Sequence, residues 1–358
     1  MSEYIIIGNL ENRRVDFFRE ALKKIKNKPL KEIHYLDILQ GRFDWLSIPK
    51  NAIIRLESPG ENFEVEKELI SKGSNGSIHI DEDFGRVRHL SEWYRGYKIL
   101  LKEIEELLQG KQVRWFNTPD AVITMFDKNL CHQAFEKHKV NSTNLIGRLE
   151  NYQQLRELMN REKKQSVFIK PANGSSASGI IALKTAGSRV SAYSSLSQKD
   201  NKLYNSLRIS NYTNEINLRQ LINTMAAENC IVEEWLPKAK VDRYSFDLRI
   251  VVVDGRACQH VVRCSKSPMT NLHLGNKRGD HNLVEKHFGK KMWEAIKNEA
   301  EKASKSIPGH HYAGVDVMIN SRTQEPVVIE INAFGDLIPN ITHEGLTTYE
   351  SELNNLKI

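Results

Sequence analysis

Carboxylate and amide side chains recur at close spacing between Gly314 and Asn332. The segment contains two runs of alternating apolar and polar residues around a short polar connection, which predicts a β-hairpin. Symmetric pairing places Asp316 opposite Glu330, and Asn332 shares the face of Glu330 because side chains alternate along a strand. Such oxygen ligands suit Mg²⁺, with Mn²⁺ as an alternative. We expect a metal site of Asp316, Glu330 and Asn332; the other interpretation is a pair of solvated polar faces on an edge hairpin.

A loop of small residues interrupts two apolar runs between Val167 and Leu183. Small side chains let backbone N–H groups approach phosphate oxygens, and Lys170 at the end of the first run supplies a positive charge. Gly174 and Gly179 reproduce part of a P-loop, but two isoleucines replace its Lys and Ser/Thr, and a strand is expected after the loop in place of a helix. The loop is therefore either a phosphate cover or an ordinary surface hairpin.

Two arginines flank a second predicted hairpin, whose turn is Asp254-Gly255. A two-residue turn places Arg263 opposite Phe246, on the face away from Arg249. If both arginines serve one phosphate, a β-bulge or a longer turn must intervene. A guanidinium group matches phosphate and carboxylate oxygens, although each arginine also fits an exposed strand position.

The strand predicted before Pro237 ends in Glu233, Glu234 and Trp235, which provide acceptors and exposed backbone for the edge of an adenine ring. Four cysteines lack C-x-x-C spacing and indicate reduced thiols. The scattered histidines indicate local hydrogen bonding more than zinc binding.

The elements that must position these groups follow from apolar periodicity. We expect strands over 4–7 and 52–56 and helices over 13–25, 63–71, 90–109, 121–139 and 155–162, then short strands from Val167 onward. The Ser/Asn/Lys-rich stretch 188–205 is expected to be a surface loop. The predicted class is α+β, with an N-terminal α/β domain (1–115), a central small α/β unit (116–235) and a C-terminal strand-rich unit (236–358).

Composition narrows the functional classes. The net charge of +7 and 40% hydrophobic residues exclude a chain that is disordered throughout. Lysines and arginines alternate with acids, so we expect no nucleic-acid partner, and the longest apolar runs are too short to span a membrane. The first residues lack the basic region of a signal peptide, so we expect a cytoplasmic protein.

Taken together in their order along the chain, these motifs resemble the ATP-grasp superfamily, in particular its branch of glutathione synthetase and ribosomal-protein glutamate ligase. The likeness spans about residues 115 to 340. It rests on Phe126-Asp-Lys128, Phe168-Ile-Lys170-Pro, Val232-Glu-Glu-Trp235, Asp247-Leu-Arg249, Arg263, Thr270 to Gly275, Gly314-Val-Asp316 and Glu330-Ile-Asn332. Ser58 to Glu61 and Asn332 to Asp336 are also similar to a smaller, largely uncharacterised ATP-grasp subgroup.

The resemblance implies an ATP-grasp architecture with a preceding α/β domain, and ATP with Mg²⁺ as cofactors. Arg249 and Arg263 would stabilise the transferring phosphoryl group beside Asn271, and Asp316, Glu330 and Asn332 would hold Mg²⁺. The residues implied to bind ATP are Lys128, Lys170, Asn173, Gly174, Ser175, Ser176, Gly179, Glu233, Glu234, Trp235, Leu236 and Asp247. Two positions depart from the branch: Asn276 replaces a second glycine after Gly275, and Phe334 replaces a small residue. Both would flank the acceptor substrate.

The implied reaction turns a carboxylate into an acyl phosphate, which an amine then attacks to form an amide or peptide bond. The expected partners are small-molecule or peptide carboxylates and amines, and a homodimer is left open. The alternatives are a ligase that forms an ester or a peptide macrocycle, and a non-catalytic ATP-binding regulator. Six residues of the first 115 could contact substrate or serve packing and surface roles: Arg55, Ser58, Arg86, Arg88, Trp93 and Arg95.

Overall fold

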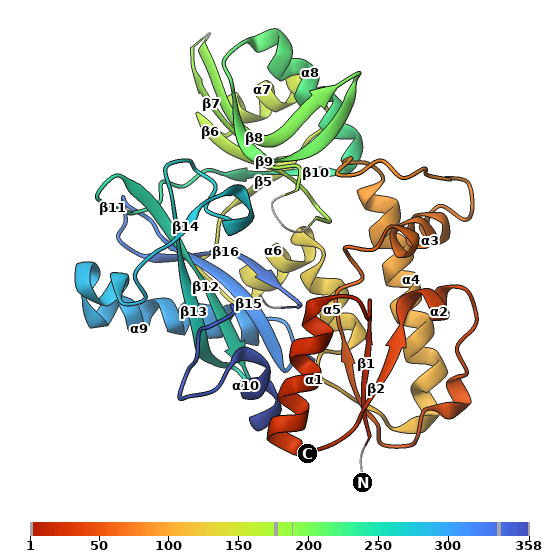
Figure 1. Cartoon of the computed structure of the whole chain (residues 1–358). Helices are drawn as coiled ribbons and strands as arrows, with labels where there is room; N and C mark the ends of the chain where they lie inside the picture. Colours follow the sequence, from red (N-terminus) through yellow and green to blue (C-terminus); the bar gives the residue numbers. More distant parts are fainter. Residues whose placement is uncertain (1–2, 175–177, 188, 335–337, 357–358) are drawn as a thin grey trace.

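The computed structural model describes residues 3–174, 178–187, 189–334 and 338–356, and its strands form three sheets (Figure 1). The first sheet is parallel with the order β2-β1-β3-β4, formed by β1 (Tyr4–Gly8), β2 (Leu30–His34), β3 (Ile53–Leu56) and β4 (Arg114–Trp115). Its helices are α1 (Arg13–Lys26), α2 (Tyr35–Leu39), α3 (Phe63–Gly73) and α4 (Leu90–Leu108), with 3-10 turns η1 (Trp45–Ser47) and η2 (Gln109–Lys111). Every residue of β1 and β3 is buried, as expected when both faces of a parallel sheet are covered.

The second sheet is antiparallel with the order β5-β10-β6-β7-β8-β9. Its strands are β5 (Leu145–Arg148), β6 (Ser166–Pro171), β7 (Ile181–Ala186), β8 (Arg189–Lys199), β9 (Lys202–Tyr212) and β10 (Cys230–Glu234). The helices α7 (Tyr152–Arg161) and α8 (Glu215–Met225) share one apolar core with this sheet, and η3 (Ala226–Glu228) follows α8.

The third sheet has the order β14-β13-β12-β15-β16, and the short β11 pairs with β12. Its strands are β11 (Lys240–Val241), β12 (Tyr244–Val253), β13 (Arg256–Ser265), β14 (Lys277–Arg278), β15 (Tyr312–Ile319) and β16 (Pro326–Asn332), with η4 (Leu272–Leu274) before β14. The helices α5 (Pro119–Met125), α6 (Lys128–Lys137) and α9 (Leu283–Lys305) contribute to its core. The last helix, α10 (Thr348–Asn354), packs against α1, which stands between the first and third sheets (Figure 1).

Two predictions about single elements need correction. The helix expected over 121–139 is two helices, because Asp127 caps the start of α6 by accepting hydrogen bonds from the backbone N–H groups of Asn129 and Leu130. The stretch 188–205, expected to be a surface loop, contributes β8 and the start of β9, and Leu196 and Leu203 bury their side chains; Ser188 lies outside the described residues. The polar residues that suggested a loop occupy the exposed positions of this hairpin.

The α+β class is confirmed. We propose domain boundaries near residues 115 and 235, because each sheet uses one of the three stretches of chain that these boundaries separate. None of the helices in the described ranges combines the length and apolar character that a membrane crossing requires.

Candidate active site

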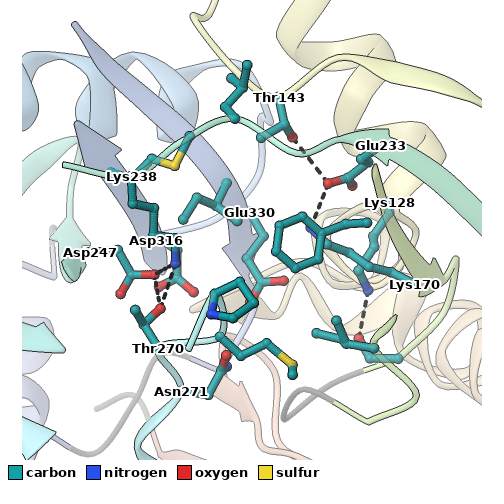
Figure 2. A pocket seen from close by; sticks show the side chains of 18 of the residues that line it. Lys128, Thr143, Lys170, Glu233, Lys238, Asp247, Thr270, Asn271, Asp316 and Glu330 are labelled. Carbon is teal, nitrogen blue, oxygen red and sulfur yellow. Dashed lines mark hydrogen bonds and ion pairs between the residues drawn. The ribbon is translucent and has the colours of Figure 1, made fainter. Parts of the chain in front are cut away.

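A cavity lies between the second and third sheets and collects most of the charged residues selected from the sequence (Figure 2). Its lining from the second sheet and nearby helices includes Lys128, Thr143, Phe168, Lys170, Gly174, Glu233, Glu234 and Leu236. Its lining from the third sheet and its loops includes Lys238, Asp247, Arg263, Met269, Thr270, Asn271, Asp316, Met318, Ile329 and Glu330. Two lysines therefore face carboxylates across one cleft.

The register of the third sheet places its charges in rows. Asp316 on β15 pairs directly with Glu330 on β16, as predicted, and with Arg249 on β12 on its other side. Both carboxylate oxygens of Asp316 accept hydrogen bonds from Arg249, and the Arg263 guanidinium lies 2.9 Å away. Burial alone would raise the pKa of Asp316, but attraction to Arg249 and Arg263 lowers it well below its usual range. Asp316 is therefore ionised and rigidly held.

A β-bulge brings the two arginines to one face. The pairing of β12 with β13 shifts between Ile250 and Val252, so Arg263 lies opposite Asp247 and not opposite Phe246. This is the irregularity that the sequence required for both arginines to act together. Arg263 Nε donates to Asp247 Oδ1 over 2.7 Å.

Lys170 and Glu233 form a buried ion pair at the opposite wall. The Lys170 Nζ lies 2.6 Å from Glu233 Oε2, and the Thr143 hydroxyl donates to the same oxygen over 3.3 Å (Figure 2). His132 Nε2 lies 3.0 Å from Glu233 Oε1. Burial disfavours both charges, but Lys170 and His132 lower the pKa of Glu233 to about 2. Attraction to Glu233 and Glu330 likewise raises the pKa of Lys170 despite its burial. The lysine is held as an ammonium that points into the cavity.

Lys128 lies at the start of α6 and donates from Nζ to the backbone oxygen of Gly174 over 2.9 Å. Burial lowers the pKa of Lys128, against the attraction of Glu330. Asn173 donates to the backbone oxygen of Phe126, which ties the start of the small-residue loop to the end of α5. Gly179 closes the loop with φ +71°, where a Cβ would come within 2.8 Å of Pro171 and Met225. Ser175 and Ser176 lie outside the described residues.

The chain at the end of β10 contributes two of the residues expected at an adenine edge to the lining of this cavity. Glu234 and Leu236 line the cavity near Met269 and Met318, whereas Trp235 packs on Phe168 at 5.2 Å and lines a neighbouring cavity. The Trp235 backbone N–H already donates to Ser166. The structure therefore directs the Trp235 side chain away from this site.

Sequence analysis missed Lys238, which donates to Asp247 Oδ2 and to the Thr270 hydroxyl, each over 2.7 Å. The sequence feature that could have identified Lys238 is its position directly after Pro237, the proline that follows the strand with Glu233. The unusual Asn276 also has a structural role, because its side-chain amide donates to the backbone oxygens of Met269 and Asn271 and so holds the loop that lines the cavity.

The residues expected to hold Mg²⁺ fit a hard cation. The Asn332 amide N–H₂ donates to Glu330 Oε1 and to the backbone oxygen of Gly314, which leaves the amide oxygen for a ligand. The Glu330 side chain is 28% exposed, and the ion pair with Arg249 spans 3.9 Å. Its carboxylate is therefore less engaged in ion pairs than that of Asp316, and more of it is available to a metal ion. Among the described residues no group of three or more His, Cys, Asp or Glu side chains has metal-binding geometry. Two carboxylates and one amide nevertheless suffice for Mg²⁺, which retains water and phosphate ligands.

A second cavity, of about 380 Å³, adjoins the first and shares Gly174, Arg263, Asn271 and Glu330 with it. Phe334, the other unusual residue, lines it and packs on Phe126 with ring centroids 5.5 Å apart. Sequence analysis missed three arginines and one glutamate of its lining: Arg13, Arg14, Arg278 and Glu61. Of the earlier substrate candidates, Ser58 lines this cavity, while Arg55 is completely buried between Glu57 and Glu352.

Comparisons with known proteins agree with this geometry. Residues 112–336 match the sequence profile described as YheC/D-like ATP-grasp. The chain matches no curated protein sequence.

Several solved structures share the fold. D-cycloserine synthetase DcsG has a TM-score of 0.58 at 12% identity, with 98% of each chain covered. The macrocyclase MdnC from Microcystis aeruginosa MRC, bound with the precursor peptide MdnA, has a TM-score of 0.55 at 11% identity over 98% of this chain and 97% of that one. D-alanine–D-alanine ligase from Bacillus anthracis, complexed with ATP, has a TM-score of 0.52 at 11% identity over 93% and 86%. These similarities confirm the expected ATP-grasp fold.

Proposed function

The chain belongs to the YheC/D-like ATP-grasp family. We propose that it is an ATP-dependent carboxylate–amine ligase, similar in its reaction to glutathione synthetase and ribosomal-protein glutamate ligase. The observation that carries the proposal is the pair of lysines, the buried Lys170 and the partly buried Lys128, that line one cavity together with Asp316 and Glu330. Such a cleft matches a triphosphate that is held by ammonium groups on one side and by a carboxylate-bound cation on the other.

In this proposal the positively charged residues bind the phosphates and the acidic residues bind the metal ion. Lys128 and Lys170 bind the phosphates, and Glu330, Asn332 and Asp316 hold Mg²⁺, which neutralises phosphate charge when bound. A substrate carboxylate oxygen attacks the γ-phosphorus and ADP leaves. Arg249 and Arg263, kept in place by Asp316 and Asp247, stabilise the transferring phosphoryl oxygens.

The second step forms the new bond. An amine attacks the carbonyl carbon of the acyl phosphate, phosphate departs, and the amine loses one proton. The acyl phosphate has to be protected from water, which would hydrolyse it, until the amine attacks. Asn271 lines both cavities, which supports a role for its side chain in contacting the acyl phosphate.

The other proposals follow from the same chemistry. The substrates are small-molecule or peptide carboxylates and amines, ATP and Mg²⁺ are the cofactors, and Glu234 and Leu236 hold the adenine. We further propose that the protein acts in the cytoplasm.

Hydroxylamine can test the ligase without knowledge of the natural amine, because it converts acyl phosphates to hydroxamates. We expect carboxylate-dependent formation of hydroxamate and ADP, which Lys170→Ala and Glu330→Ala abolish. Lys184→Ala is the control for Lys170, because it removes an exposed ammonium from β7 of the same sheet. Product formation that survives both active-site substitutions contradicts the proposal, and so does tight Mg-ATP binding without turnover for any carboxylate.

A further inference from the structure

The second cavity carries more positive charge than the reaction needs. Its walls combine the start of α1, the loop around Gly60 and strands of the third sheet. We propose that the activated substrate carries a second acidic group, bound by Arg13, Arg14 and Arg278. The substrate class is then a dicarboxylate or polycarboxylate, such as an acidic amino acid or a glutamyl or aspartyl peptide. This inference rests on the proposed function, since it places the activated carboxylate beside Arg249 and Arg263.

Unequal pairing of the five arginines of this cavity supports the inference. Arg249 and Arg263 contact Asp316 and Asp247. In contrast, no carboxylate of the described ranges lies within ion-pair distance of Arg13, Arg14 or Arg278. Within the described part of the chain, these three arginines therefore have no carboxylate partner, unlike the first two, and this distinguishes them as a site for a bound anion.

Strand register adds a second observation. Arg278 on β14 lies directly opposite Arg263 on β13, so both side chains project from the same face of the sheet. Like charges at directly opposed positions repel. The charge of Arg263 is met by Asp247 and Asp316, whereas among the described residues Arg278 donates a hydrogen bond to the backbone oxygen of Pro339, over 3.0 Å, and has no carboxylate partner. An anion bound there removes the repulsion.

The start of α1 is also an unfavourable place for arginine. Arg13 and Arg14 follow the N-cap Asn12, where the helix dipole is positive and acidic side chains are favoured. The surrounding loops are nevertheless held firmly: the Asn9 amide donates to the backbone oxygens of Pro59 and Gly60, and the Asn12 amide donates to Glu61. Two arginines are thus kept in a costly position on a fixed wall of the cavity, as expected for binding residues.

ATP does not account for this charge. Arg13, Arg14 and Arg278 line the second cavity and not the first, where Lys128 and Lys170 face the metal-binding carboxylates. The anion that they bind therefore belongs to a substrate other than ATP, and we assign it to the activated carboxylate substrate because Arg249 and Arg263 line the same cavity.

The test measures equilibrium binding to protein loaded with Mg²⁺ and a non-hydrolysable ATP analogue, by calorimetry. The probes are glutarate and glutaramate, which differ by one carboxylate replaced by an amide, and a glutamyl tripeptide with its glutaminyl counterpart. We expect each acid to bind about 10-fold or more tightly than its amide. The double variant Arg13→Gln/Arg14→Gln and the variant Arg278→Gln should each remove this preference and leave the affinity for the ATP analogue unchanged.

Matched controls remove the same charge nearby. Lys23→Gln changes an exposed position of α1, and Lys277→Gln changes the residue beside Arg278 whose side chain points to the opposite face of β14. Both should keep the preference for acids. The arginine variants should also keep the thermal stability of the parent, since they relieve unfavourable charge.

In the binding experiment, three results overturn the inference: equal binding of acids and amides, no binding of any acid, or weaker ATP-analogue binding in the arginine variants, which would assign these residues to the nucleotide. The hydroxamate assay separates this from failure of the proposed function. Activation of monocarboxylates as readily as dicarboxylates refutes the inference and leaves the ligase intact. Selective binding of diacids without formation of any hydroxamate refutes the proposed ligase function and leaves the acid-binding role of the three arginines intact.

Discussion

The substitution Glu233→Gln tests whether the buried ion pair holds Lys170 in its charged form. Glu233 is the direct partner of Lys170 Nζ at 2.6 Å, and both side chains are almost completely buried. Glutamine keeps the shape and one hydrogen-bond acceptor but removes the negative charge. Breaking a buried pair from one side costs about 3–5 kcal/mol, and the retained acceptor should reduce this to about 2–3 kcal/mol of unfolding free energy.

The same change should alter nucleotide binding in a pH-dependent way. Burial disfavours the ammonium form of Lys170, and attraction to Glu233 and Glu330 holds its pKa above the usual value. Without the Glu233 charge the pKa of Lys170 falls. As pH rises through that lowered pKa, the lysine loses its proton and its attraction for phosphate. We expect Mg-ATP affinity about 10-fold lower than in the parent at pH 9, equivalent to about 1.4 kcal/mol, and a smaller loss at pH 7.

Urea unfolding and calorimetric titration of a non-hydrolysable ATP analogue at the two pH values measure these effects. Glu162→Gln is the matched control, because this residue at the end of α7 lies outside the cavity and forms an exposed pair with Arg161 at 3.0 Å. Exposed pairs contribute about 0–1 kcal/mol, so this variant should resemble the parent. The reasoning is refuted if the two variants bind nucleotide equally well with the same pH profile.

Three further perturbations test the metal site, a buried charge cluster and a helix crossing. Glu330→Gln should weaken nucleotide binding by at least about 10-fold with Mg²⁺ present and leave it unchanged with EDTA, as measured by titration; an equal loss in both conditions contradicts the metal role. Burial raises the pKa of Glu352 to about 7 despite its ion pair with Arg55, so the folded state holds a proton that the unfolded chain releases near pH 4.5. As pH rises from 4.5 to 7, the unfolding free energy of the parent should therefore fall by about 2–3 kcal/mol more than that of Glu352→Gln. Urea unfolding at the two pH values measures this, and an equal change in both proteins would exclude it. Gly96→Ala places a Cβ 1.9 Å from the Leu69 backbone oxygen where α4 crosses α3, so it should lower the unfolding free energy by about 2–3 kcal/mol. Gly110→Ala, which has no atom within 4 Å of its added Cβ, should not.

Local patterns were sufficient for much of the site. Alternation of apolar and polar residues predicted the hairpin of β15 and β16, and symmetric pairing of its strands predicted that Asp316 lies opposite Glu330, as the structure shows. The Asp254-Gly255 turn predicted the other hairpin. Even the bulge between Ile250 and Val252 was anticipated, because a regular turn would have put Arg249 and Arg263 on opposite faces.

Other features depended on contacts between distant parts of the chain. Polar content suggested a loop at 188–205, yet the stretch is a β-hairpin because cross-strand pairing satisfies its backbone and the polar side chains take its exposed positions. The environment of Glu233 was likewise invisible in the sequence, since His132, Thr143 and Lys170 come from three separate segments.

The sequence by itself determined the α/β start of the chain, the two hairpins that carry the arginines and the carboxylates, the lysine motifs, and the resemblance to ATP-grasp proteins, because these depend on spacing within short segments. Only the tertiary structure decided which charges meet. Ion pairing acts over a few ångströms between residues that are far apart along the chain. Arg13 and Arg14 join Arg278 in one cavity only because α1 packs between two sheets, and no local pattern contains that information.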